Sequence, residues 1–359
     1  MSIFENIATK VRDKRRISPE EALFLFESND LLAIGELSAI ANEQKNGSNV
    51  FFNVNRHINP TNVCVNRCAF CAFYRTKEDY GAYTLTQEEI CRRVQEAVTD
   101  GATEVHIVGG LHPELSFEYY ENALKAIGRI APQLHIKAFT AVEIDHFSRI
   151  SGLTVQQVLE RLKSAGLGSM PGGGAEILVE EVRQKICPEK ITGQRWLEII
   201  DLAHHAGLKS NATMLYRHIE TFANRVTHID MLRNLQDKTG GFQAFIPLPF
   251  QTENSSLKIS GSLNSGLDDL KTLAISRIFL DNFDHIKAYW VMLGEKIAQV
   301  SLAFGVNDLD GTVVEEKIGH DAGAKSPQAM TRDSIIRLIY RAGKVPVERD
   351  TLYNQLRSY

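Results

Sequence analysis

Short apolar stretches rich in β-branched and aromatic residues alternate with longer amphipathic stretches from residue 50 onward, the pattern of repeated strand and helix units. The apolar stretches predict eight strands, at residues 50–59, 104–110, 135–141, 167–170, 208–215, 242–248, 285–290 and 307–312. The amphipathic stretches between them predict seven helices, at residues 86–100, 117–131, 154–165, 193–207, 222–240, 269–282 and 294–305. This order predicts an α/β fold, a (β/α)₈ barrel of the TIM type, whose functional residues lie on the loops after the strands.

The N-terminal part of the chain predicts helices without strands. Ser18 precedes the segment "PEEALFLFES", and Glu21 stands where a capping box needs an acidic residue. The polar stretch 251–266 has no apolar periodicity, and both a lid over the barrel mouth and a plain surface loop remain open for it. The expected parts of the chain are an N-terminal helical extension over residues 1–48, the barrel over residues 49–320, and a helical tail that packs on it over residues 321–359.

Composition and charge narrow the class of protein. The chain has 359 residues, 43% of them hydrophobic, and a formal net charge of -4. Because there is no surplus of basic residues to neutralise phosphates, we expect no nucleic-acid partner. The sequence contains no run of eighteen apolar residues, and its N-terminus lacks the apolar core of a secretion signal. We therefore expect no membrane partner and a cytoplasmic location.

Three of the five cysteines lie within eight positions of one another. Cys64, Cys68 and Cys71 give the spacing C-x₃-C-x₂-C on the loop after the first predicted strand. An iron-sulfur cluster held by three thiolates leaves one iron open to a small molecule, whereas a tetrahedral zinc site needs a fourth ligand. His57 is the candidate fourth ligand in that zinc alternative. The two remaining cysteines, Cys91 and Cys187, are expected to pack as small hydrophobic side chains.

Other residues at the same rim are candidates for binding a ligand. Gly109 and Gly110 follow the second predicted strand, where glycine lets the backbone approach a ligand closely. The stretch 166–177 contains three successive glycines and includes Glu176 near its end. Glu176 is expected either to contact a ribose or to be a carboxylate at a helix N-terminus. Arg183 is expected either to bind a carboxylate or to lie on a solvated helix face.

Polar residues at the ends of barrel strands are more often directed to a site than buried in the walls, where they would need partners. The further candidates on this ground are Thr140, Glu143, Asn211, Thr213, Tyr216, His218, Gln243, Asp310 and Thr312. The sequence does not identify a catalytic residue among these. The candidates kept for a catalytic role are His57, Glu143, Asn211, Thr213, Tyr216 and His218.

The cysteine spacing, with Phe70 before the last cysteine on the first loop of a βα barrel, resembles the radical S-adenosylmethionine superfamily. The resemblance implies a 4Fe-4S cluster on the three cysteines, with S-adenosylmethionine chelating the fourth iron. It also implies an electron donor such as flavodoxin or ferredoxin. Gly109 and Gly110 resemble a glycine-containing segment of that superfamily, whose backbone binds the ammonium group of the methionyl part of S-adenosylmethionine. The cofactor-binding residues expected on this ground are Phe70, Phe73, Tyr74, Gly109, Gly110, Glu176 and Arg183.

Longer segments resemble the aminofutalosine (aminodeoxyfutalosine) synthase family of the futalosine route to menaquinone, from about residue 15 to the end. They include "NRHINPTNVCVNRCAFCAFYR", "GLGSMPGGGAEI", "DNFDHIKAYWVMLG" and "DLDGTVVEEKI". The resemblance implies that the 5'-deoxyadenosyl radical adds to 3-[(1-carboxyvinyl)oxy]benzoate. The products are 6-amino-6-deoxyfutalosine, methionine and bicarbonate. The candidates for binding the two carboxylates of this aromatic dicarboxylate are Arg56, His57, Arg183 and His218.

Two alternatives to this activity stay open at the level of the sequence. A sister enzyme, of the dehypoxanthine futalosine cyclase or deazaflavin (F0) synthase type, would abstract hydrogen and release 5'-deoxyadenosine. A non-catalytic zinc protein of the Cys₃His type is the more distant alternative.

Overall fold

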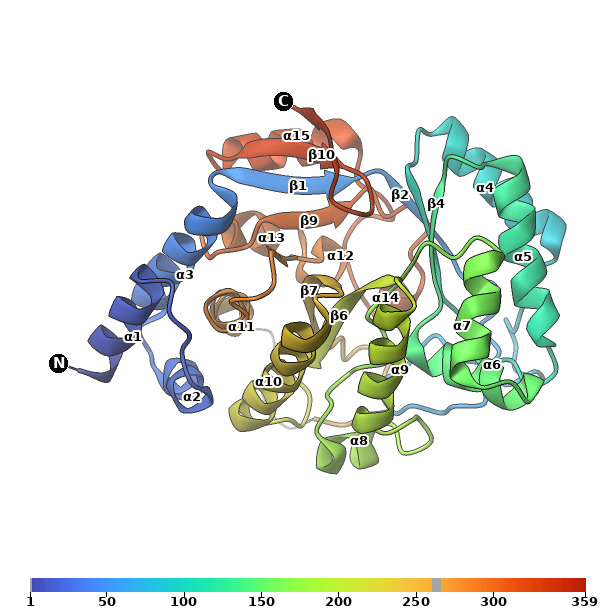
Figure 1. The fold of residues 1–359 in the computed structure, drawn as a ribbon, viewed down its shortest axis with the longest axis horizontal. Coiled ribbons are helices and arrows are strands. Elements are labelled where there is room, and N and C mark those ends of the chain that lie inside the picture. The colour runs from blue at the N-terminus through green and yellow to red at the C-terminus, as the bar shows by residue number, and fades with distance from the viewer. Residues whose placement is uncertain (1, 260–265) are drawn as a thin grey trace.

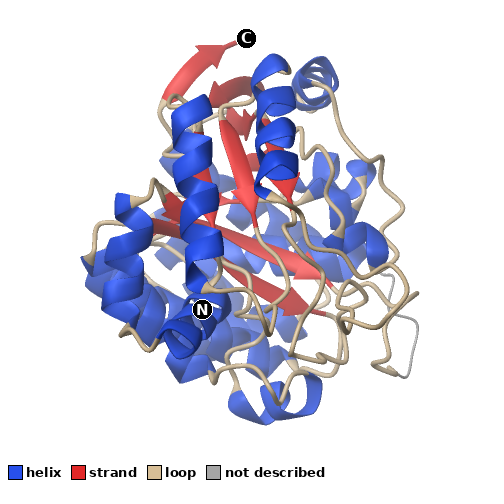
Figure 2. Ribbon diagram, turned by 90° about the vertical axis from the view of Figure 1, so that its right-hand side faces the viewer, coloured by secondary structure: helices blue, strands red, loops and turns tan. Residues whose placement is uncertain are grey.

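The computed structural model describes residues 2–259 and 266–359. A parallel sheet of seven strands, in sequential order from β2 to β8, curls through the middle of the chain, with helices on its outer side (Figures 1 and 2). Its strands are β2 (Asn55–Ile58), β3 (Glu104–Ile107), β4 (His135–Ala138), β5 (Ser169–Met170), β6 (Lys209–Tyr216), β7 (Phe242–Pro249) and β8 (His285–Ile286). The α/β class and the barrel-like parallel sheet are therefore confirmed.

Several of the helices that follow these strands begin at a threonine cap. Capping boxes start α4, α6, α7 and α10, because in each the threonine accepts a bond from the third helical residue, whose side chain returns one. The helices of this part are α4 (Gln87–Thr99), α5 (Phe117–Ile130), α6 (Ala141–Ser151), α7 (Val155–Ser164), α8 (Glu180–Ile186), α9 (Gly193–His205), α10 (Phe222–Thr239), α11 (Gly266–Phe279), α12 (Trp290–Leu293), α13 (Glu295–Ser301) and α14 (Ile318–Asp321).

A second, smaller sheet corrects the prediction of one strand over residues 50–59. The chain forms two strands there, β1 (Asn49–Asn53) and β2, which belong to different sheets. The small sheet has the order β11-β10-β1-β9, with β9 (Asp308–Gly311), β10 (Val345–Arg349) and β11 (Gln355–Ser358). Only Val54 separates the two strands and most residues of both are buried, so the hydrophobic pattern alone does not mark the change of sheet.

The eighth predicted strand, at residues 307–312, does not complete the barrel sheet. It forms β9, which pairs in parallel with β1 and is joined to β8 by an isolated bridge between Lys287 and Asp308. Gly311 allows this pairing, since a Cβ there would lie 2.4 Å from the carbonyl oxygen of Asn53. The barrel sheet therefore has seven strands, and the prediction of eight was wrong in this respect.

The seven predicted helices do not include α6, α8, α12 and α14. The predicted strand at 135–141 ends at Ala138, and α6 begins at Ala141 after Phe139, whose φ of 61° turns the chain. A non-glycine residue with positive φ is uncommon, so the sequence gives little indication of this turn.

The N-terminal segment forms the helices α1 (Ile3–Arg12), α2 (Pro19–Glu27) and α3 (Leu31–Asn46). Figure 1 shows these helices (blue) beside α10 and α11, and Phe26 stacks on Phe222 of α10 with ring centroids 5.3 Å apart. The segment after residue 320, predicted as a helical tail, contains α15 (Arg332–Arg341) but also the strands β10 and β11. No helix of the described residues has the length and apolar character needed to cross a bilayer.

Candidate functional site

A cavity of about 300 Å³ lies at the carboxyl ends of the barrel strands. The loops after the strands supply its lining, as expected for this fold. The predicted residues that line it are His57, Cys64, Cys68, Phe70, Cys71, Phe73, Tyr74, Gly109, Gly110, Thr140, Glu143, Glu176, Asn211, Thr213 and Asp310. Residues more than 200 positions apart along the chain therefore meet at one place.

The cysteine loop is held by hydrogen bonds of its backbone. The Cys71 N–H donates to the carbonyl of Cys68 at 3.0 Å, and the Cys64 N–H donates to the carbonyl of Arg75 at 3.0 Å. The described part of the predicted lid or loop, residues 251–259, contacts the cysteine loop, because the Leu257 N–H and the Ser255 hydroxyl both donate to the carbonyl of Ala69. Residues 260–265 of that stretch lie outside the described residues.

Burial disfavours an unpaired thiolate at two of the three cysteines. Burial raises the pKa of Cys68 to about 12 and also raises the pKa of Cys71. A thiolate at these positions therefore needs a cation beside it, as iron provides. Cys187 is buried outside the lining and Cys91 lies on α4, which agrees with a packing role for both. Among residues 2–259 and 266–359, no three His, Cys, Asp or Glu side chains are grouped closely enough to hold a single metal ion.

The glycine pair packs on the backbone that leads into the cysteine loop. The Gly110 N–H donates to the carbonyl of Thr61 at 2.8 Å. A Cβ at Gly110 would lie 2.2 Å from the carbonyl oxygen of Val63, and one at Gly109 would lie 3.0 Å from that of Thr61. Only glycine permits this approach, so the pair fixes the position of the chain immediately before Cys64.

Glu143 connects the glycine pair to the start of α6. Its carboxylate accepts hydrogen bonds from the N–H of Gly109 at 3.1 Å and from the N–H and hydroxyl of Thr140 at 2.7 and 2.9 Å. The side chain is buried, and burial raises the pKa of Glu143 to about 7 because it disfavours the charged form. Glu143 therefore positions the backbone of the glycine loop.

Lys190 is a cavity residue that the sequence analysis missed. Its ammonium group lies 2.5 Å from Oε1 of Glu176 and 4.9 Å from the ring centroid of Phe70. Glu176 therefore already has a cationic partner at the cysteine end of the cavity. The only indication in the sequence was a lysine shortly after Pro188, in a loop that no strand pattern assigns to the site.

Comparisons with known proteins agree with this site. Residues 58–232 match the model of the Radical SAM superfamily, and residues 239–358 match that of the CofH/MqnC C-terminal region. An aminodeoxyfutalosine synthase from Thermus thermophilus is 45% identical over 354 residues, which cover 98% of this chain and 95% of that protein. The chain belongs to the aminodeoxyfutalosine synthase family of radical S-adenosylmethionine enzymes.

Proteins with other names are also similar to this chain over most of its length. A cyclic dehypoxanthine futalosine synthase from Streptomyces coelicolor is 42% identical over 346 residues, covering 95% of this chain and 86% of that protein. The X-ray structure of the FeFe-hydrogenase maturase HydG from Carboxydothermus hydrogenoformans has a TM-score of 0.78 at 18% identity, covering 98% of this chain and 80% of that one. The structural likeness shows the fold, and the sequence likeness shows the family.

Enzymes of this superfamily use a 4Fe-4S cluster and S-adenosylmethionine, and the cavity fits both. Three thiols line it and, among the described residues, no fourth cysteine does. A cluster held there would keep one iron free for a small chelating molecule. The glycine pair and Glu143 present backbone and carboxylate groups beside the cysteine loop, which suits the polar end of an amino acid.

Arg183 lies outside the cavity lining. Its guanidinium donates to the backbone carbonyls of Ala175 at 2.5 Å, Ile177 at 3.2 Å and Ile191 at 2.6 Å, and the side chain is 1% exposed. These bonds occupy the donors that a ligand carboxylate would need. The arginine holds the glycine-rich loop instead of facing the site.

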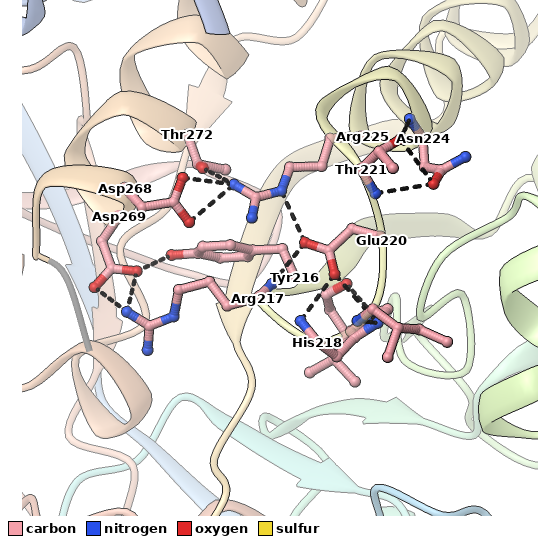
Figure 3. A network of polar contacts seen from close by, with 12 residues as sticks. Tyr216, Arg217, His218, Glu220, Thr221, Asn224, Arg225, Asp268, Asp269 and Thr272 are labelled. Carbon is pink, nitrogen blue, oxygen red and sulfur yellow. Dashed lines mark hydrogen bonds and ion pairs between the residues drawn. The ribbon is translucent and has the colours of Figure 1, made fainter. Parts of the chain in front are cut away.

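Tyr216 and His218 also lie outside the lining, in a buried polar network at the end of β6 (Figure 3). The Tyr216 hydroxyl donates to Asp269 of α11 at 2.6 Å, and Arg217 forms an ion pair with the same carboxylate at 2.9 Å. The His218 N–H donates to Glu220 at 2.8 Å. The network joins the loop after β6 to the start of α11, so these two residues serve the fold in this structure.

The remaining candidates outside the lining have partners in the protein. Arg56 pairs with Glu96 at 2.6 Å and with Glu315 at 3.1 Å. The amide of Gln243 donates to the carbonyl of Thr351 at 2.7 Å, and the Thr312 hydroxyl donates to that of Asn55 at 2.8 Å. Successive side chains of a strand point to opposite faces, which explains why His57 reaches the cavity and its neighbour Arg56 does not.

Replacement of Glu143 by glutamine is expected to change how stability depends on pH. Between pH 4.5, the ordinary pKa, and about 7, folded wild type keeps the proton on Glu143 whereas the unfolded chain loses it. Wild type therefore loses stability as the pH rises through this window, by up to about 3 kcal/mol, and E143Q does not. Denaturant unfolding of both proteins from pH 4.5 to 7.5 measures the difference. Parallel pH profiles for the two proteins would contradict this expectation.

Replacement of Asp269 by asparagine is expected to destabilise the fold by about 3–5 kcal/mol, because it leaves the buried Arg217 without its counter-charge. The free energy of urea unfolding measures this. Glu181→Gln is the matched control, since it breaks an exposed pair with Lys185 and is expected to cost less than about 0.5 kcal/mol. Equal losses for the two variants would show that the buried network does not stabilise the fold.

Proposed function

We propose that this enzyme joins the adenosyl group of S-adenosylmethionine to 3-[(1-carboxyvinyl)oxy]benzoate in menaquinone biosynthesis. The products are 6-amino-6-deoxyfutalosine, methionine and bicarbonate. The observation that carries the proposal is 45% identity over nearly the whole chain to a protein named aminodeoxyfutalosine synthase, together with a cavity that unites the three cysteines.

In this proposal Cys64, Cys68 and Cys71 hold the cluster. When bound, the cluster supplies the electron that cleaves S-adenosylmethionine to methionine and an adenosyl radical, after reduction by a donor of the flavodoxin or ferredoxin class. The glycine pair and Glu143 orient the methionyl end of S-adenosylmethionine through hydrogen bonds. Glu176 beside Lys190 is the candidate for the ribose hydroxyls.

The rest of the cavity lining suits a reactive radical and an aromatic substrate. Apolar side chains, among them Leu215, Ile246 and Leu248, line the same cavity. An apolar enclosure excludes water and restricts side reactions of a reactive intermediate. Because the radical adds to a double bond, the first step needs no general base, and we assign none.

Anaerobic mass spectrometry of a turnover mixture tests the proposed function. The mixture contains the reconstituted enzyme, a reductant, S-adenosylmethionine and the enolpyruvyl benzoate. We expect a substrate-dependent product that retains adenine and ribose, with methionine released. Free 5'-deoxyadenosine with unchanged benzoate would overturn the proposal and favour a sister activity, such as that of the cyclic dehypoxanthine futalosine synthase relative.

A further inference from the structure

A row of three polar residues lies deep in the cavity. His57 on β2 is in register with His106 on β3, and His106 is in register with Lys137 on β4. Residues in register on neighbouring parallel strands point to the same face of the sheet, and all three line the cavity. His106 precedes Gly109 by three residues, so the row lies roughly 10 Å along the chain from the glycine pair.

The row supplies hydrogen-bond donors that are not all used by the protein. His57 is 6% exposed, and its Nε2 has no hydrogen-bond partner among the described residues. Its ring packs on that of His106 with centroids 4.4 Å apart. Since buried polar groups are nearly always paired, this buried and unpaired nitrogen, on a residue that lines the cavity, is a hydrogen-bonding group that the protein leaves unused.

Lys137 supplies the positive charge of the row. Its ammonium group is buried and pairs with Glu104 at 2.8 Å, but an ammonium group has three donors. Among the described residues, Lys137 and Lys190 are the lysines that line the cavity, and no arginine does. Lys190 belongs to the cysteine end, where Glu176 holds it.

Neighbouring carboxylates do not leave a net negative charge at the row. Asp310 pairs with Lys287, and Asp308 pairs with Arg349 at 2.7 Å. Glu316 pairs with His320 at 3.1 Å, and that contact raises the pKa of His320 to about 9. An incoming carboxylate therefore meets balanced ion pairs and the donors of the row, without an uncompensated charge of its own sign.

We propose that Lys137, His57 and His106 bind the ring carboxylate of the aromatic substrate. This inference rests on the proposed function. The reacting double bond of the substrate must face the cysteine loop and the glycine pair, which places the ring carboxylate, at the other end of the molecule, toward the row. Lys137, which also pairs with Glu104, donates from its ammonium group, and each imidazole offers one N–H donor.

The test compares acids with the corresponding amides. Equilibrium dialysis measures binding of 3-hydroxybenzoate and 3-hydroxybenzamide to the holoenzyme, and kinetics compare the substrate with its ring carboxamide. We expect wild type to prefer the acid by roughly 10- to 100-fold, because the amide loses a charge-assisted hydrogen bond. Equal binding of acid and amide by wild type would overturn the proposal.

The decisive variant changes both members of the buried pair, Glu104→Gln with Lys137→Met, so that no lone charge stays buried. We expect it to lose the preference for the acid, through KM more than kcat. The matched control is the same double change in an exposed pair of α8, Glu181→Gln with Lys185→Met, which should keep the preference. Retention of the wild-type preference in the Glu104/Lys137 variant would overturn the proposal.

A second variant keeps the inference testable if the double variant does not fold. His57→Phe preserves a ring beside His106 but removes both nitrogens, and we expect weaker binding of 3-hydroxybenzoate with unchanged binding of the amide. An equal loss for both compounds, or for neither, would count against the row. Because dialysis needs no turnover, failure of the row is distinguishable from failure of the proposed function, which is judged by the products of wild type alone.

Discussion

Replacement of Cys68 by serine is expected to remove iron and sulfide from the protein and to abolish product formation. A serine oxygen is a harder ligand than the thiolate that an iron-sulfur cluster requires. The same result is expected for Cys64→Ser and Cys71→Ser, because all three side chains line the cavity. Iron and sulfide content per chain and the broad absorption near ~400 nm measure the loss.

Cys91→Ser is the matched control for the three cysteine variants. Cys91 lies on α4 and does not line the cavity. The control should keep wild-type iron, sulfide and turnover. Full iron content in Cys68→Ser, or loss of iron in Cys91→Ser, would contradict the assignment of the three cluster ligands.

Replacement of Gly110 by alanine is expected to reduce turnover at least about 100-fold, the loss that a displacement of about 1 Å can cause at a reacting centre. The added Cβ would lie 2.2 Å from the carbonyl oxygen of Val63, so the backbone before Cys64 must move. Two tightly packed backbone segments have no free volume to absorb the methyl group. Turnover and iron content of the purified variant measure the effect.

Gly128→Ala controls for the change of glycine to alanine itself. Gly128 lies in α5, and a Cβ there would meet no atom within 4 Å. Alanine in a helix is favoured over glycine by about 0.5–1 kcal/mol, so this variant should be at least as stable as wild type and equally active. Wild-type turnover in Gly110→Ala would show that the close packing of the glycine pair is not required.

Local features of the sequence predicted local structure well. Amphipathic periodicity predicted most helices of the barrel, and Ser18 with Glu21 predicted the capping box that starts α2, because a cap acts on amide groups only a few residues away. The positive φ of Phe139 and the change of sheet between β1 and β2 were not predictable in this way. Both depend on pairing with strands far along the chain, which hydrophobic periodicity does not report.

The residues of the candidate site were also predicted only in part. The spacing of Cys64, Cys68 and Cys71 identified the chemistry, since all three ligands come from one short loop. The expectation that polar residues at strand ends face the site selected Tyr216 and His218, which instead belong to a polar network with α11. The same expectation did not select His106 or Lys137, which line the cavity. A buried lysine costs free energy unless it is paired, so its presence in a strand is not expected from the residue type alone.

The family, the cluster chemistry and the alternation of strands and helices can be derived from the sequence, because they depend on motifs and hydrophobic patterns that are each local in the chain. The tertiary structure alone decided which polar side chains share the cavity. Register across β2, β3 and β4 brings His57, His106 and Lys137 to one face, while the alternation within β2 directs Arg56 away from it. Those positions are fixed by hydrogen bonding between strands tens of residues apart, and no local pattern encodes them.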